Sequence, residues 1–226
     1  MAYLLHIEST STVCSVAISK DAELLSLKEL NNGYTHAENL HVFIEQVLRE
    51  SNLKAGDLNA VSVSSGPGSY TGLRIGFSAA KGLAFALNIP LITIDTLKVL
   101  SVIAILQVKT DAVFIPFMDA RRMEVYCAAY DQKLNEVLPV QALVLNEESI
   151  KAFELNKPLY FFGDGMPKAK ELLQQLPQAH FIEGITASAS GMIQMALEKY
   201  NVKDFADVAY SEPNYLKEFF FHTAKK

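Results

Sequence analysis

Hydroxyl residues and a glycine turn at two points of the chain could bind a phosphate group. Residues 9–11 are all hydroxyl residues and follow Glu8 at the end of an apolar run, and a Gly-Pro-Gly turn follows a second apolar run at residues 66–68. Hydroxyls and the free backbone N–H groups of a glycine turn before a helix can donate hydrogen bonds to an anion. The alternative, in which these hydroxyls only cap helices and form turns, is favoured. The residues of this candidate weak phosphate site are Ser9, Thr10, Ser11, Gly66 and Gly68.

The glycine turn matches neither of the two common phosphate-binding fingerprints. No Gly-Lys-Ser or Gly-Lys-Thr follows it, and Lys81 lies more than two turns into the next helical segment. The spacing of Gly66, Gly68 and Gly72 also differs from that of a dinucleotide fingerprint. Neither fingerprint therefore supports a bound cofactor, and we predict none.

The histidines and cysteines do not form a catalytic or metal-binding pattern. His36 and His41 are five positions apart, whereas two ligands on one helical face need a spacing of four. Cys14 and Cys127 lie in apolar runs without a Cys-x-x-Cys motif, as expected for small core residues. There is no His-Glu-x-x-His zinc motif and no Gly-x-Ser-x-Gly turn. We predict no catalytic residue and no metal site.

The order of strand-like and helical segments predicts an α/β chain of two similar halves. Three strand-like runs precede a helix, a strand and a second helix, and three strand-like runs follow one another again from residue 113. We expect residues 1–106 to form the first half, joined by the C-terminal segment 213–226. Residues 107–212 would form a smaller second half.

The second long helix, predicted over residues 69–87, carries a ridge of small residues. Gly72, Gly76, Ala80 and Ala84 recur at every fourth position, which places them on one helix face. Glycine inside a helix costs about 0.8–1 kcal/mol relative to alanine, so another backbone must approach the ridge closely. The spacing does not decide whether that backbone belongs to the chain's own sheet or to another subunit.

Composition and charge limit the classes of partner. The 226 residues are 50% hydrophobic, enough for a substantial core, and the net charge is −5. With a pI near 5.6, this charge argues against a dedicated electropositive surface for nucleic acid. The longest apolar run is too short to cross a bilayer and no signal peptide is visible, so we expect a soluble, cytoplasmic protein.

The stretch SSGPGSYTGLRIGFSAAKGLA at residues 64–84 resembles the signature of the TsaB family, also called YeaZ. Further landmarks of that family occur in order at residues 7–18, 36–38, 118–121, 162–165 and 213–216, so the resemblance covers essentially the whole chain. It implies an actin/hexokinase-like (ASKHA) fold made of two ribonuclease H-like halves, each of βββαβα type.

The resemblance also implies a function in tRNA modification. Members of the TsaB family are non-catalytic subunits of the machinery that makes threonylcarbamoyladenosine in tRNA. They bind and activate the catalytic subunit TsaD, with the ATPase TsaE as third component, and reach tRNA indirectly through the complex. Without TsaD the same helices would pair two copies as a homodimer. The family interface is built from the first two long helices, here with Leu40, Phe43, Ile44, Val47, Gly72, Ile75, Gly76, Ala79, Ala80 and Leu83.

The alternative is a stand-alone ATP-binding phosphotransferase or ATPase of the actin-hexokinase superfamily. In that superfamily an Asp commonly ends the first strand, and the longer carboxylate Glu8 in that place argues against this alternative. A corresponding glycine turn approaches the adenine in nucleotide-binding relatives, which adds Gly163 and Gly165 to the candidate nucleotide site. The sequence does not decide whether nucleotide binds, whether the chain touches tRNA directly, or what the turn at residues 119–121 does.

Overall fold

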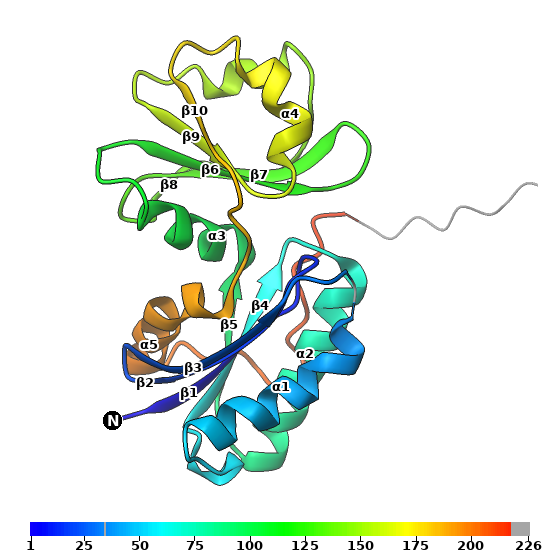
Figure 1. Cartoon of the computed structure of the whole chain (residues 1–226), viewed down its shortest axis with the longest axis vertical. Coiled ribbons are helices and arrows are strands. Elements are labelled where there is room, and N and C mark those ends of the chain that lie inside the picture. Colours follow the sequence, from blue (N-terminus) through cyan, green and yellow to red (C-terminus); the bar gives the residue numbers. More distant parts are fainter. Residues whose placement is uncertain (34, 218–226) are drawn as a thin grey trace, which may run out of the picture.

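The computed structural model describes residues 1–33 and 35–217, and it contains two five-stranded sheets stacked along the long axis (Figure 1). The first sheet has the order β3-β2-β1-β4-β5, and the second has the order β10-β9-β6-β7-β8. The strands of the first sheet are β1 (Tyr3–Glu8), β2 (Cys14–Lys20), β3 (Glu23–Leu30), β4 (Ala60–Gly66) and β5 (Leu91–Asp95). Those of the second are β6 (Val113–Asp119), β7 (Glu124–Tyr130), β8 (Glu136–Val144), β9 (Leu159–Phe162) and β10 (Ala179–Ile182).

The two sheets share one topology. In each, the first three strands form an antiparallel meander, and the remaining two strands add in parallel on the other side of the first strand. This repetition of the ribonuclease H-like strand order confirms the predicted fold class with its two βββαβα-type halves.

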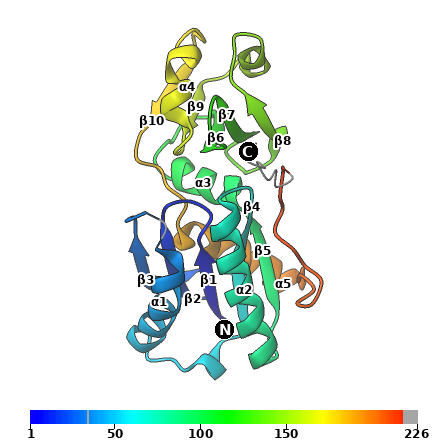
Figure 2. The ribbon, with the colours of Figure 1, turned by 90° about the vertical axis from the view of Figure 1, so that its right-hand side faces the viewer.

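Helices cover the outer faces of both sheets and fill the space between them (Figure 1). Figure 2 shows the two long helices α1 and α2 side by side in front of the first sheet. Ser69 caps α2 by accepting a hydrogen bond from Gly72 N, and Asn88 ends it in a left-handed conformation. The helices are α1 (His36–Glu50), α2 (Tyr70–Leu87), α3 (Thr96–Ile105), α4 (Met166–Leu173) and α5 (Ile193–Val202), with short 3-10 helices η1 (Ala55–Asp57), η2 (Ser149–Phe153) and η3 (Ala189–Met192).

Three apolar cores follow from this layering. One core lies between α1, α2 and the first sheet, and another lies between the second sheet, η2 and α4. The largest lies between the two sheets and contains residues of α3, η3 and α5 together with Phe114, Met118 and Tyr130 of the second sheet. The space between the halves is therefore a packed core.

The chain returns to the first half before the C-terminal segment. Helix α5 contacts β1 and β5, and η3 contacts β1 and β2, although both elements lie in the range predicted for the second half. We therefore propose a division in which the second half spans residues 107–188. Asn214 N donates to Ser65 O at 2.6 Å, which places that part of the C-terminal segment on the first half. Residues 218–226 lie outside the described residues.

Among the residues that the structure describes, no helix combines the length and the apolar character needed to cross a membrane.

Candidate functional site

The end of β1 holds a fully buried carboxylate. Glu8 accepts hydrogen bonds from Thr10 N at 2.7 Å, from Thr10 Oγ1 at 2.5 Å and from the hydroxyl of Ser64 at the end of β4. Burial raises the pKa of Glu8 above its ordinary value, and the hydrogen bonds from Ser64 and Thr10 oppose that rise. The carboxylate is thus enclosed by donors from its own chain.

Helix η3 closes this site from the side of the second half. The Met192 sulfur lies 3.9 Å from Ser64 Oγ, and Ala189 N donates to Ser15 Oγ at 2.9 Å. Met192 and Ala189 are completely buried. No sequence pattern around residue 192 signals this contact, because it joins residues 128 positions apart.

The predicted phosphate-binding hydroxyls make contacts within the chain. Ser9 Oγ donates to Gly72 O at 2.9 Å, and Thr10 O accepts from Ser69 N at 2.7 Å. Ser11 Oγ accepts from Val13 N at 3.2 Å. These contacts fix the β1–β2 turn against the start of α2, as in the turn-forming interpretation.

The predicted glycines also lie close to other parts of the backbone. A Cβ on Gly68 would come within 2.6 Å of Thr10, and one on Gly66, which has a φ of 110°, within 2.7 Å of Asn214 O. In the second half, Gly163 packs against Phe117, and a Cβ on Gly165 would lie 2.8 Å from Met118 C. Such close approaches explain why glycine occupies these positions.

Two hollows test whether these groups meet in one nucleotide-sized site. Ser11 and Thr12 face Asp164 across a hollow of about 20 Å³, whereas small-molecule sites usually measure about 300–1,000 Å³. A hollow of about 370 Å³ contains Gly163 but none of the hydroxyl residues, and it is lined by Met166, Pro167, Lys170, Glu183 and Gly184. Neither of these two hollows brings the glycines and the hydroxyl residues together at nucleotide size.

The glycine ridge of α2 packs against the chain's own first strand. A Cβ on Gly72 would overlap the carbonyl oxygen of Ser9, and one on Gly76 would overlap the Ser9 hydroxyl. Ala80 and Ala84 are buried in the core beneath α2. The spacing left two alternatives open, and the structure shows that Ser9 of the chain's own first half provides the close approach that offsets the cost of glycine at Gly72 and Gly76. A contact of these helices with another subunit stays a prediction.

The ten predicted interface residues divide into an inward and a more exposed group. Besides Gly72, Gly76 and Ala80, the inward group contains Leu40, Ile44, Val47 and Ala79, all buried in the core between the helices and the first sheet. Phe43, Ile75 and Leu83 are partly exposed at the edges of α1 and α2.

Sequence reasoning missed the most exposed apolar residues of the helix pair. Phe85 of α2 is 81% exposed and Val42 of α1 is 47% exposed. Gly82 has no atom within 4 Å of the position of its missing Cβ. Gly82 and Phe85 lie off the inward ridge, so their position on the helical wheel could have separated them from it. We call Val42, Phe43, Ile75, Gly82, Leu83 and Phe85 the outer helix surface.

Comparisons with known proteins agree on one family. The family model described as TsaD, tRNA N6-adenosine threonylcarbamoyltransferase, matches residues 32–224. The tRNA threonylcarbamoyladenosine biosynthesis protein TsaB of Bacillus subtilis is 27% identical over 95% of this chain and 93% of its own length. The TsaB protein of Buchnera aphidicola subsp. Schizaphis graminum is 31% identical over 74% of this chain and 80% of its own.

A solved structure shares the fold over most of the chain. The structure of YeaZ from Pseudomonas aeruginosa matches with a TM-score of 0.79 at 24% identity, covering 96% of this chain and 100% of that one. The agreement includes both halves and the segment that returns to the first sheet.

Proposed function

The chain belongs to the TsaB (YeaZ) family of tRNA threonylcarbamoyladenosine biosynthesis proteins, within the wider family of the TsaD model, and from this premise we propose that it is a non-catalytic subunit. It binds a TsaD-like homologous subunit and holds it in its active conformation. A TsaE-like ATPase is the third component, and the assembly works on tRNA in the cytoplasm. Without its partner the chain forms a homodimer through the same surface.

The outer helix surface is the observation that carries this proposal. Exposed apolar side chains are common singly, but a group that includes a phenylalanine 81% exposed favours a protein contact. In Figure 2 no other described element lies over the two helices that carry it. A homologous partner presents a similar helix pair, which fits a four-helix contact between related subunits.

The enclosed end of β1 supports a non-catalytic role. A fully buried carboxylate that accepts three hydrogen bonds, one of them from the Ser64 hydroxyl that Met192 contacts, cannot reach a substrate without movement of its surroundings. The alternative function, a stand-alone ATP-binding phosphotransferase, has less support because the hydroxyl run faces a hollow of only about 20 Å³. Calorimetry with Mg-ATP tests the alternative, and binding or hydrolysis by the isolated chain would favour it.

Size-exclusion chromatography with light scattering tests the interface. Phe85→Asp should convert the homodimer to a monomer and abolish the complex with the TsaD of the same organism, because it places a charge on the outer helix surface. Val202→Asp is the matched control, since Val202 is 76% exposed on α5, away from both long helices. Unchanged association of the Phe85 variant, or equal loss in both variants, would refute this placement of the interface.

A further inference from the structure

Arg74, Arg121 and Arg122, three of the four arginines of the chain, form no ion pair with a carboxylate of the described residues. The arginines are Arg49, Arg74, Arg121 and Arg122, and all four are exposed. Every ion pair found within residues 1–33 and 35–217 uses a lysine or the N-terminal amine as its cation. The arginine side chains are therefore not neutralised by neighbouring acids of the described chain.

The C-terminal segment links Arg74 to the turn between β6 and β7. Arg74 donates a hydrogen bond to Tyr215, and its guanidinium carbon lies 4.3 Å from the centre of the Tyr70 ring. The Tyr70 and Tyr215 rings are 5.0 Å apart. Two residues further, Lys217 forms an ion pair with Glu124 at the start of β7. Three residues of chain span at most about 10 Å, so Arg74 and this turn lie on the same side of the molecule.

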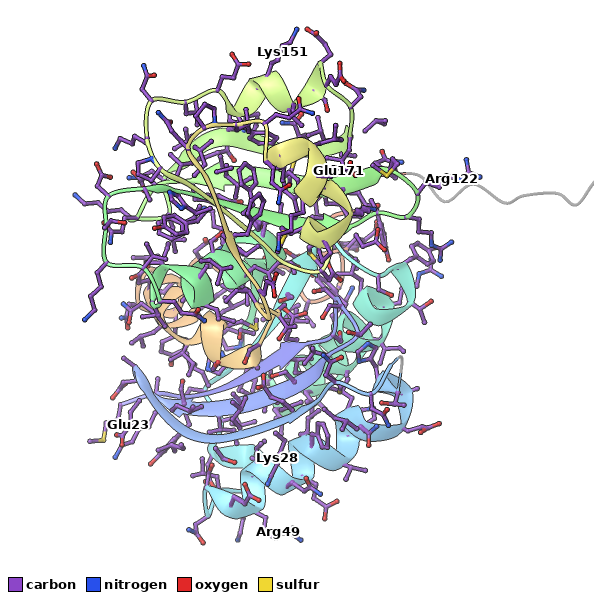
Figure 3. The ribbon with its side chains drawn as sticks, turned by 45° about the horizontal axis from the view of Figure 1, so that its top comes forward. Glu23, Lys28, Arg49, Arg122, Lys151 and Glu171 are labelled. Carbon is purple, nitrogen blue, oxygen red and sulfur yellow. The ribbon has the colours of Figure 1, made fainter. Side chains whose placement is uncertain are left out.

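The turn itself is held in a strained conformation that displays two arginines. Arg121 and Arg122 have φ angles of 69° and 48°, which non-glycine residues rarely adopt. Lys168 of α4 fixes the turn, because its Nζ pairs with Asp119 and donates to Arg122 O at 2.8 Å and Glu124 O at 2.5 Å. In Figure 3, Arg122 lies at the right-hand edge of the upper part of the molecule, whereas Arg49 lies at the bottom.

Two lysines thus form ion pairs with the acidic residues of the turn, and the arginines of the turn are left for other contacts. Asp119 is paired with Lys168, and Glu124 is paired with Lys217. Arg121 and Arg122 form no ion pair with a described residue. Exposed guanidinium groups without a carboxylate partner in the described chain can bind an anionic partner. Arginines that served the stability of the fold would instead be paired with a nearby carboxylate.

We propose that Arg74, Arg121 and Arg122, with Tyr70 and Tyr215, contact the tRNA directly, and we call these five residues the arginine surface. Guanidinium groups bind phosphodiesters with paired hydrogen bonds, and tyrosine rings stack on unpaired bases. The inference rests on the proposed function only in its choice of RNA as the polyanion. The net charge of −5 still makes the isolated chain a weak RNA binder, so the contact adds to a larger surface on the partner.

Fluorescence anisotropy with the full chain and a labelled, unmodified tRNA transcript tests the proposal between about 50 and 200 mM salt. Arg121→Gln/Arg122→Gln should weaken binding roughly fivefold at the lower salt and reduce the slope of log K against log salt by about 1.4, for two lost phosphate contacts. Arg121→Lys/Arg122→Lys should keep the slope while losing part of the affinity, because lysine keeps the charge but not the planar fork.

Arg49→Gln/Lys54→Gln is the matched control, because it removes the same charge from exposed residues near the end of α1, and Arg49 lies away from Arg122 in Figure 3. Absence of RNA binding by the wild type, or equal losses in both glutamine variants, would overturn the proposal. Competition by poly-glutamate as effective as that by RNA would indicate an acidic protein instead. Phe85→Asp should keep its RNA affinity, so a failed partner interface and a failed arginine surface give different results.

Discussion

The two halves of the molecule end their first strands with the same local arrangement in opposite surroundings. In the first half Glu8 accepts from the backbone N–H of Thr10, and in the second half Asp119 accepts from that of Arg121, again two residues ahead. Glu8 is fully buried, whereas the Asp119 side chain is 50% exposed and paired with Lys168. The same fold therefore holds a buried, hydrogen-bonded carboxylate at the end of β1 and an exposed, charged turn at the end of β6.

The difference extends to the neighbouring strands. The residue two positions before Glu8 is His6, which lies between Ser62 and Ser19 in the adjacent strands at 2.7 and 2.9 Å. The residue two positions before Asp119 is Phe117, which packs against the rings of Phe153 and Phe161. The first half therefore keeps polar groups in its central strand, and the second half has an aromatic core. Acid should consequently affect the two halves differently.

The largest expected effect is a loss of stability in acid that comes from His6. Burial lowers the pKa of His6 to about 3, while the unfolded chain keeps its ordinary value of 6.5. As the pH falls from 6.5 toward about 3, only the unfolded state binds this proton, so the free energy of unfolding falls by up to about 1.4 kcal/mol per pH unit. Urea denaturation at a series of pH values measures this slope.

His6→Gln isolates the effect, because glutamine can still donate to and accept from the two serines but does not titrate in this range. The free energy of unfolding of the variant should change less with pH than that of the wild type. The raised pKa of Glu8 acts in the opposite direction, by favouring the folded state in acid, and it cancels in this difference. His180→Gln in the second half is the control, since His180 is exposed on β10. Equal slopes for wild type and His6→Gln would contradict the explanation.

The second comparison replaces each strand-end carboxylate by its amide. Glu8→Gln should lower the free energy of unfolding by about 1–3 kcal/mol, because the amide NH₂ must face a donor and leaves a buried polar group unsatisfied. Asp119→Asn should cost only about 0–1 kcal/mol, as expected for an exposed ion pair. Urea denaturation at neutral pH measures both. Similar costs would mean that the two strand ends do not differ in enclosure.

The sequence predicts the parts of this comparison that depend on local pattern. Apolar runs predicted both strand meanders, and the spacing of Gly72 and Gly76 correctly required a close backbone approach. The spacing could not identify Ser9 as the neighbour of Gly72, because that contact joins residues 63 positions apart. The contact of Met192 with Ser64 was likewise beyond local pattern, since η3 returns to the first sheet only after the whole second half.

The left-handed arginines were also beyond prediction from sequence. Asn and Asp are the residues that usually indicate this conformation outside glycine, so an Arg-Arg pair gives no signal of it. Lys168 imposes the conformation from α4, 46 positions along the chain from Arg122. The backbone of this turn is therefore set by a tertiary contact rather than by its own residues.

The smallest expected effect distinguishes strain from function in the exposed turn at the end of β6. Arg122→Asn should raise the free energy of unfolding by about 0.5–1 kcal/mol, because asparagine tolerates a positive φ better than arginine does. Leu134→Asn is the control, since Leu134 has a φ of 62° in the β7–β8 turn and should give a similar gain. If the arginine surface contacts tRNA, only Arg122→Asn should also weaken RNA binding in the anisotropy assay. A loss of stability in Arg122→Asn would instead show that the arginine side chain supports the fold, and the two strand ends would then both be structural.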